Sequence, residues 1–208
     1  MEAVRSLNGW LRKPPVWPFY ILAAVPFGWY VWLAATNGLG PDPVKTLEHG
    51  LGKLGLQFLV ASLCVTPLLR ITRINLMRFR RMLGLACFAY VALHFAVYLF
   101  LDLQLDWGAL AKDLTKRPYI IAGTSAFLLL VPLAVTSNGW SVRRLGGAAW
   151  AKLHRLVYPA AVLAALHYIW LVKAWPLEPM VYGVGIAILL ASRGLRNIRN
   201  PQRVARAS

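Results

Sequence analysis

Three of the chain's four histidines lie inside long apolar stretches, where an ionisable ring is unusual. His94 sits in one such stretch. His154 and His167 share another, KLHRLVYPAAVLAALHYIW at residues 152–170. Histidine in lipid is costly unless its ring nitrogens are satisfied. A neutral imidazole meets that demand through hydrogen bonds or by ligating a metal. The fourth histidine, His49, lies at the edge of an apolar run and needs no special explanation.

The segments that must position these histidines have the composition of membrane helices. Of the 208 residues, 59% are hydrophobic and only 14% are charged, whereas soluble domains carry about a quarter charged residues. Six apolar runs approach the ~20 residues that cross a bilayer. These runs cover residues 17–36, 52–71, 82–101, 119–136, 153–172 and 177–193. We predict an all-α integral membrane bundle of six transmembrane helices, a single membrane domain over residues 1–208 with a basic tail at 194–208.

The basic residues predict how the bundle is oriented. A net charge of +16 is also typical of nucleic-acid-binding proteins, but most Lys and Arg residues gather on alternate connections between the spans. The clusters fall within residues 5–13, 70–81, 143–155 and 193–206. The positive-inside rule then places both termini and these loops in the cytoplasm. Six of the seven acidic residues lie at or beyond the outer span ends, and no carboxylate lies in the middle of a span. This disfavours proton pumps and many ion-coupled transporters.

The predicted topology converts sequence position into depth. Counted from the inner ends of the third and fifth spans, His94 lies about 18 Å and His167 about 22 Å into the membrane. In a hydrocarbon core about 30 Å thick, both lie in the outer half, whereas His154 lies near the inner surface. A haem between the third and fifth spans would take one imidazole on each face. We therefore predict His94 and His167 as an outer ligand pair and His154 as the ligand of an inner site.

The spacing of the two histidines in the fifth span requires an irregular helix. Thirteen residues separate His154 from His167, which leaves their rings about 140° apart around an ideal helix. They share a face only if the helix bends between them. Pro159 lies between them and predicts a kink.

Several segments together resemble a known family. They are RRMLGLACFAYVALHFAVY (80–98), KRPYIIAG (116–123), LAVTSNGW (133–140), RLGGAAWAKLHRLVY (144–158) and LHYIWLVK (166–173), with NGLGPDPVKTLEHGLGK (37–53) and TPLLR (66–70). They resemble the MsrQ family, formerly YedZ. These are haem-binding membrane subunits of the bacterial protein-methionine-sulfoxide reductase system, related to the ferric reductase-like transmembrane domain family. The resemblance covers roughly residues 15–195.

The resemblance implies a bacterial inner-membrane protein that binds b-type haem. It implies that electrons pass from the quinone pool or a cytosolic flavin reductase to a periplasmic molybdenum enzyme, MsrP, which repairs oxidised periplasmic proteins. FMN is a further cofactor implied by the family. Carried over by motif, the haem-iron ligands are His94, His154 and His167. The chain would be an electron-transfer subunit without catalytic residues of its own.

Two departures from the related oxidases leave questions open. Those proteins use two histidines fourteen residues apart on the third helix, and the position fourteen before His94 is Arg80. The second ligand of an inner haem is therefore open, and one or two haems are possible. The flavin and NADPH domain of the oxidases is missing from this sequence, so we expect quinol, bound flavin or a separate reductase as the donor.

Three other functions remain as alternatives. A ferric metalloreductase would use the same helices and differ only in its acceptor. A non-redox transporter would use the histidines for substrate or protons and would hold no stoichiometric haem. A structural or assembly role in the membrane is the third alternative.

Overall fold

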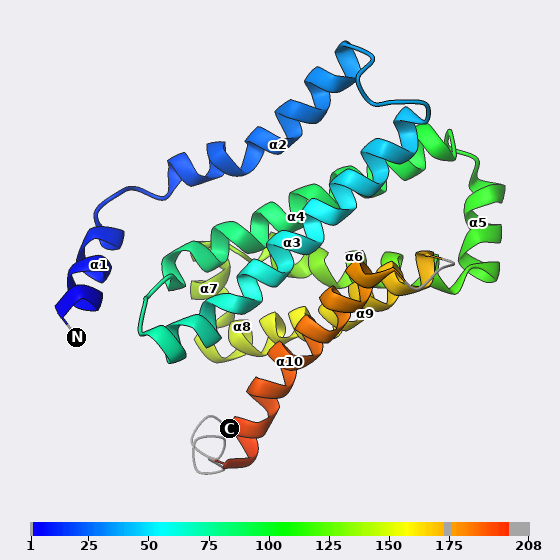
Figure 1. Ribbon diagram of the computed structural model, residues 1–208. Coiled ribbons are helices and arrows are strands. Elements are labelled where there is room, and N and C mark those ends of the chain that lie inside the picture. The colour runs from blue at the N-terminus through cyan, green and yellow to red at the C-terminus, as the bar shows by residue number, and fades with distance from the viewer. Residues whose placement is uncertain (1, 173–175, 200–208) are drawn as a thin grey trace. The chain divides into compact units, whose positions relative to one another are not determined.

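The computed structural model describes residues 2–172 and 176–199, and this part of the chain contains helices and connections but no strand. The all-helical fold is thus confirmed (Figure 1). The predicted tail at 194–208 lies largely outside the described residues. The α-helices are α1 (Glu2–Arg12), α2 (Trp17–Ala35), α3 (Pro43–Thr72), α4 (Arg80–Val97), α5 (Trp107–Lys116), α6 (Pro118–Val135), α7 (Gly139–Leu145), α8 (Gly147–Leu153), α9 (Val157–Leu171) and α10 (Leu177–Arg199). Three short helices complete them: the 3-10 helices η1 (Met77–Phe79) and η3 (His154–Leu156), and the π-helix η2 (Tyr98–Asp102).

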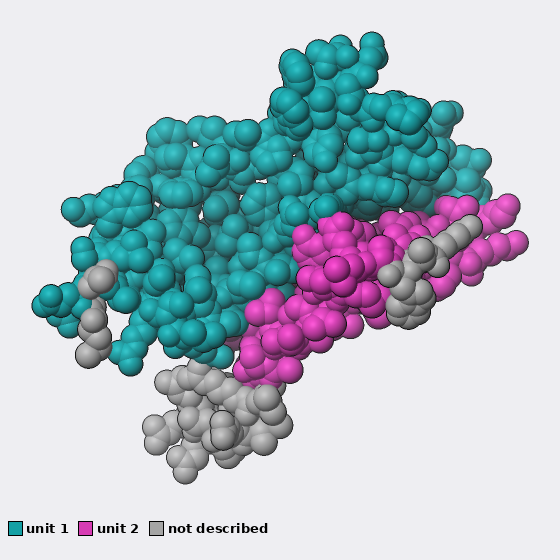
Figure 2. Space-filling view, in the orientation of Figure 1, with its two compact units in different colours: residues 1–110 teal, residues 111–208 magenta. Residues whose placement is uncertain are grey.

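The chain divides into two compact units, residues 1–110 and 111–208 (Figure 2). In the first unit α3 packs along α4, and α2 contacts both helices. In the second unit α6 packs along α9, and α10 packs on α9. Each unit is therefore built around one dominant helix pair. In both pairs the second helix carries one of the predicted ligands, His94 on α4 and His167 on α9.

Among the described residues, four segments are long and apolar enough to cross a membrane. They are α2, α3, the η1–α4–η2 segment Met77–Asp102 and α6. They correspond to the first four predicted spans. Of the remaining two, α9 is 15 residues long and α10 is 23. The count of six transmembrane helices stays a prediction.

The helix that contains the second predicted span extends beyond that span. The α3 helix starts at Pro43, before residue 52, and Asp42 caps it. The Asp42 carboxylate accepts a hydrogen bond from the Lys45 backbone N–H at 3.2 Å, and proline suits the first helical position. The Lys45 ammonium also donates to Asp42 at 2.7 Å, and this bond lowers the pKa of the carboxyl. The residues from 43 to 51, including Glu48 and His49, consequently belong to the helix.

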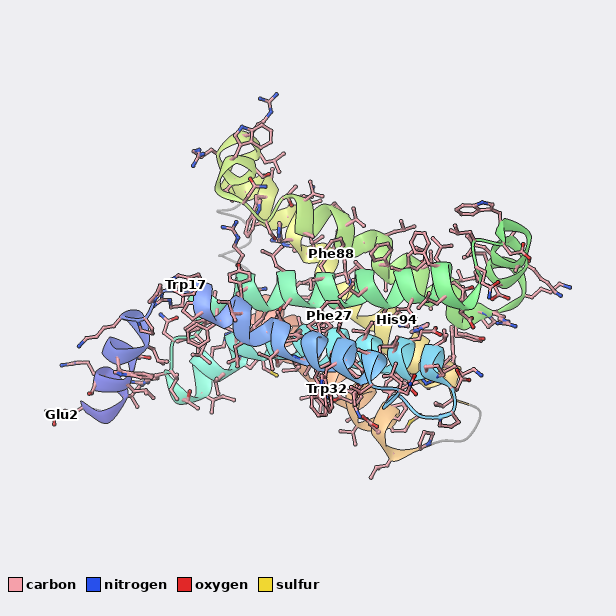
Figure 3. The ribbon with its side chains drawn as sticks, turned by 90° about the horizontal axis from the view of Figure 1, so that it is seen from above. Glu2, Trp17, Phe27, Trp32, Phe88 and His94 are labelled. Atoms are coloured by element: carbon pink, nitrogen blue, oxygen red, sulfur yellow. The ribbon has the colours of Figure 1, made fainter. Side chains whose placement is uncertain are left out.

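The α2 helix presents apolar side chains all round. None of its residues is buried. Trp17, Trp29 and Trp32 are exposed, and the rings of Trp29 and Trp32 stack with centroids 4.9 Å apart. Figure 3 labels Trp17, Phe27 and Trp32 along this helix. Such a surface fits a lipid environment, with tryptophans at the interface levels.

Tyr90 of α4 joins α4 to α2 within the first unit. Its hydroxyl donates to the Ala23 carbonyl at 2.7 Å and accepts from the Phe27 N–H at 3.1 Å. These two backbone groups are four residues apart and would bond to each other in an unbroken helix. Pro26 lies beside them, and a proline in a helix interior disturbs its ladder. The neighbouring helix thus satisfies backbone groups next to a proline, as transmembrane helices require.

We expect Tyr90→Phe to destabilise the first unit. It removes both hydrogen bonds and leaves two backbone groups in apolar surroundings, at a cost of about 1–3 kcal/mol. The measurement is the Tm of the protein in detergent. Tyr20→Phe, on the exposed side of α2, is the matched control. An equal Tm for both variants would show that Tyr90 does not anchor α2.

Candidate functional site

His94 is bonded to the backbone of the helix that pairs with its own. Its Nδ1 lies 2.8 Å from the carbonyl oxygen of Glu48 on α3. The side chain is half-buried in the last turn of α4 (Figure 3). The Tyr98 N–H bonds to the carbonyls of both His94 and Phe95, and the π-helix η2 begins at Tyr98. The helix widens there because the Leu103 N–H bonds to the Tyr98 carbonyl, five residues earlier, at 2.9 Å. Widened turns of this kind are frequent at functional sites.

His167 repeats this arrangement in the second unit. Its Nδ1 lies 2.7 Å from the carbonyl oxygen of Tyr119 on α6. The ring is half-buried, and the Tyr119 ring lies near it with centroids 6.3 Å apart. The sequence separation between histidine and carbonyl is 46 residues in the first unit and 48 in the second. Each unit therefore holds one imidazole fixed by a carbonyl of the partner helix.

These hydrogen bonds define the protonation of both rings. A carbonyl oxygen can only accept, so Nδ1 carries the proton in His94 and in His167. In a neutral imidazole Nε2 then holds the lone pair. Metal-ligating histidines commonly donate their other ring N–H to a backbone carbonyl or carboxylate, which fixes the tautomer and raises ligand basicity. The two residues thus have the chemical form that a haem-iron ligand needs.

His154 has different partners. Its Nδ1 lies 3.0 Å from the Trp150 carbonyl, one turn earlier in its own segment, and its Nε2 lies 3.4 Å from the Ser137 hydroxyl. Its ring stacks on the Trp150 indole, with centroids 3.8 Å apart. The indole N–H in turn donates to the Thr136 carbonyl at 2.9 Å. Its role as an inner ligand stays a prediction.

The irregularity between His154 and His167 lies at His154 itself. The short 3-10 helix η3, His154–Leu156, separates α8 from α9. Pro159 is the third residue of α9, in the first turn, where the missing N–H has no carbonyl to lose. The kink expected at Pro159 stays a prediction, whereas the irregular turn that the structure shows begins at His154, five residues before the proline.

Sequence reasoning identified the histidines but missed their partners. The Glu48 and Tyr119 carbonyls belong to the backbone and leave no mark of residue type. The one available signal was glycine. Gly52 and Gly123 each follow the accepting carbonyl by four residues, within the quoted segments at 37–53 and 116–123. His49, next to Glu48, is exposed and lies apart from this pattern.

Comparison with known proteins first defines the class. Residues 50–165 match the family described as ferric reductase like transmembrane component. The match is more than half of the chain and includes α4 with His94 and the η3 turn with His154. It ends two residues before His167. No solved structure matches the chain.

Named relatives then define the family within that class. A protein of Brucella anthropi is 45% identical over 192 residues, which are 92% of this chain and 87% of that protein. Proteins of Brucella ovis and Brucella canis are each 47% identical over 178 residues, 86% of this chain and 80% of theirs. All three are named protein-methionine-sulfoxide reductase heme-binding subunit MsrQ. The chain belongs to the MsrQ family.

The tautomer assignment is testable without any cofactor. We expect His94 and His167 to carry their proton on Nδ1 in the haem-free protein, because each donates to a carbonyl. The measurement is 15N NMR of protein labelled at its histidines, with His94→Ala and His167→Ala used to assign the signals. An Nε2-protonated ring at either position would contradict the site geometry.

Proposed function

We propose that this chain is a haem b subunit that carries electrons across the membrane, and that His94 and His167 would hold the haem iron. The observation that carries the proposal is the pair of equivalent Nδ1 hydrogen bonds to the Glu48 and Tyr119 carbonyls. Each bond leaves Nε2 as the ligating atom and holds the ring in one orientation. The haem, when bound, supplies a one-electron iron couple. The name of the Brucella relatives supports the same cofactor.

The pairing of the two histidines on one outer haem rests on the sequence. Their depths along the third and fifth predicted spans match, and the predicted topology of six spans with both termini cytoplasmic runs these spans in the same direction. His154 then serves an inner site near the cytoplasmic surface. One or two haems per chain are compatible with three candidate histidines.

The route of the electrons follows from the family. We propose that the donor is the quinone pool or a cytosolic flavin reductase, and that the acceptor is the periplasmic reductase MsrP. FMN is a further cofactor that the family implies. Methionine sulfoxide in oxidised periplasmic proteins would be the final substrate. The chain's residues orient and insulate the carriers, and no residue of the chain forms a covalent intermediate. The location is the bacterial inner membrane.

A ferric metalloreductase is the second candidate, because the matching family model is described as ferric reductase like. Both functions use the same ligands and differ in the acceptor. A stable complex of the purified chain with MsrP, together with oxidation of the reduced chain by MsrP and sulfoxide, favours the methionine-sulfoxide system. Oxidation by ferric chelates alone, without a complex with MsrP, favours the metalloreductase.

His167→Ala tests the proposed ligands. We expect the purified variant to lose the outer haem while keeping its fold, because alanine offers no lone pair to iron. The readouts are haem per polypeptide, the reduced-minus-oxidised absorption spectrum and the elution volume in detergent. His49→Ala, which changes an exposed histidine, is the control and should keep full haem content. A His167→Ala protein with an unchanged spectrum and haem content refutes the ligand assignment.

A further inference from the structure

Each of the two accepting carbonyls lies one helical turn before a glycine in its own helix. The carbonyl of Glu48 is followed four residues later by Gly52, and that of Tyr119 by Gly123. In an α-helix the carbonyl of residue i already accepts from the N–H of residue i+4. A carbonyl oxygen has a second lone pair, which the imidazole uses here.

The side chain at i+4 normally stands in the way of such a second bond. Every Cα–Cβ bond in a helix tilts towards the N-terminus, so the side chain at i+4 covers the turn that contains carbonyl i. Glycine has no Cβ and permits close approach of another group to the backbone. A ring from a neighbouring helix can therefore reach the carbonyl.

The structure gives the distances that a Cβ would have at these positions. At Gly52 it would lie 3.0 Å from Nδ1 and 3.3 Å from Cε1 of His94. At Gly123 it would lie 2.6 Å from Nδ1 and 2.9 Å from Cε1 of His167. The distances to Nδ1 at both positions are shorter than ordinary contacts of a Cβ atom. At Gly123 a Cβ fits only if the His167 ring moves. In each case the atom that meets the added carbon is the one that makes the hydrogen bond.

We propose that Gly52 and Gly123 are positioning residues that set the ligand strength of His94 and His167 by keeping their Nδ1–H groups on a helix carbonyl. This inference rests on the proposed haem function. A hydrogen bond from Nδ1–H places more electron density on Nε2, which makes the imidazole a stronger donor and favours ferric iron. The two glycines thus hold the haem potential low, one from each unit. His154 lacks this arrangement, because its carbonyl partner, Trp150, lies four residues earlier in its own segment, and the residue at i+4 is therefore His154 itself.

The two glycine positions differ in how close an added Cβ would come to the histidine ring. A Cβ at Gly52 meets the ring at the distance where a small ring shift suffices, whereas a Cβ at Gly123 displaces the ring outright. We therefore expect Gly52→Ala to retain haem at a more positive midpoint potential. We expect Gly123→Ala to bind haem about 10–100-fold more weakly, the usual effect of losing such an outer partner.

The chain offers matched packing controls. A Cβ at Gly55, one turn beyond Gly52 on α3, would lie 2.7 Å from Val91 Cγ2 of α4. A Cβ at Gly183 of α10 would lie 2.9 Å from Ile169 Cδ1 of α9. Gly55→Ala and Gly183→Ala therefore disturb the same helix neighbourhoods without touching a histidine. They should leave the midpoint potential unchanged, even where they lower Tm.

The experiment is a spectroscopic redox titration of the full-length protein in detergent for the unmodified chain and all four variants, with haem counted per polypeptide. Histidine 15N NMR of the haem-free Gly52→Ala protein adds a readout that needs no cofactor, and it should show His94 no longer protonated on Nδ1 alone. A more positive potential in Gly52→Ala and weak haem binding in Gly123→Ala, with both controls unshifted, support the inference. If Gly123→Ala does not fold, the Gly52→Ala potential and NMR decide.

Two results overturn the inference and are distinguishable from each other. In the first, the unmodified protein holds haem, but the midpoint potential of Gly52→Ala is unchanged or that of Gly55→Ala shifts by the same amount. This result refutes the role of the glycines and leaves the proposed function standing. Unmodified protein that folds without haem refutes the proposed function and the inference together.

Discussion

The structure depends on one constraint, which is that polar groups inside a membrane must find their partners within the protein. An imidazole placed among apolar helices meets this constraint by donating its Nδ1–H to a helix carbonyl. His94 does so at 2.8 Å and His167 at 2.7 Å. The same bond that makes the ring tolerable in lipid leaves its other nitrogen in the form that binds iron. Stability and the proposed ligation of haem iron therefore draw on a single interaction in each unit.

This hydrogen bond requires close packing of the two helices. A ring can reach the backbone of a neighbouring helix only where the two helices approach closely and where no Cβ intervenes. The α3–α4 and α6–α9 pairs satisfy both conditions, with Gly52 and Gly123 at the contact. Tyr90 meets the same constraint from the opposite direction, because its hydroxyl satisfies two backbone groups of α2. In each case a side chain of one helix is hydrogen-bonded to the backbone of a neighbouring helix.

Much of this could be predicted from the sequence, and the rest depends on which helices meet. Apolar length predicted the helices, and the three histidines stood out because ionisable rings are rare in such runs. The start of α3 was missed because its first turns, from Pro43 to His49, are polar enough to resemble a loop. The sequence predicted a kink at Pro159, since proline is the visible helix breaker, and it did not predict the 3-10 turn at His154. The carbonyls of Glu48 and Tyr119 could not be predicted, because residue type says nothing of a backbone oxygen and the glycines acquire meaning only once each helix's partner is known.

The central claim is that Nδ1-anchored imidazoles ligate the haem iron, and the most direct measurement is the axial ligation of the ferric protein. Electron paramagnetic resonance combined with near-infrared magnetic circular dichroism identifies the two ligands of a low-spin haem. The account predicts a low-spin haem with two neutral imidazole ligands, at one or two haems per chain. A high-spin haem, a histidine–methionine pair, or a folded protein without haem would contradict it.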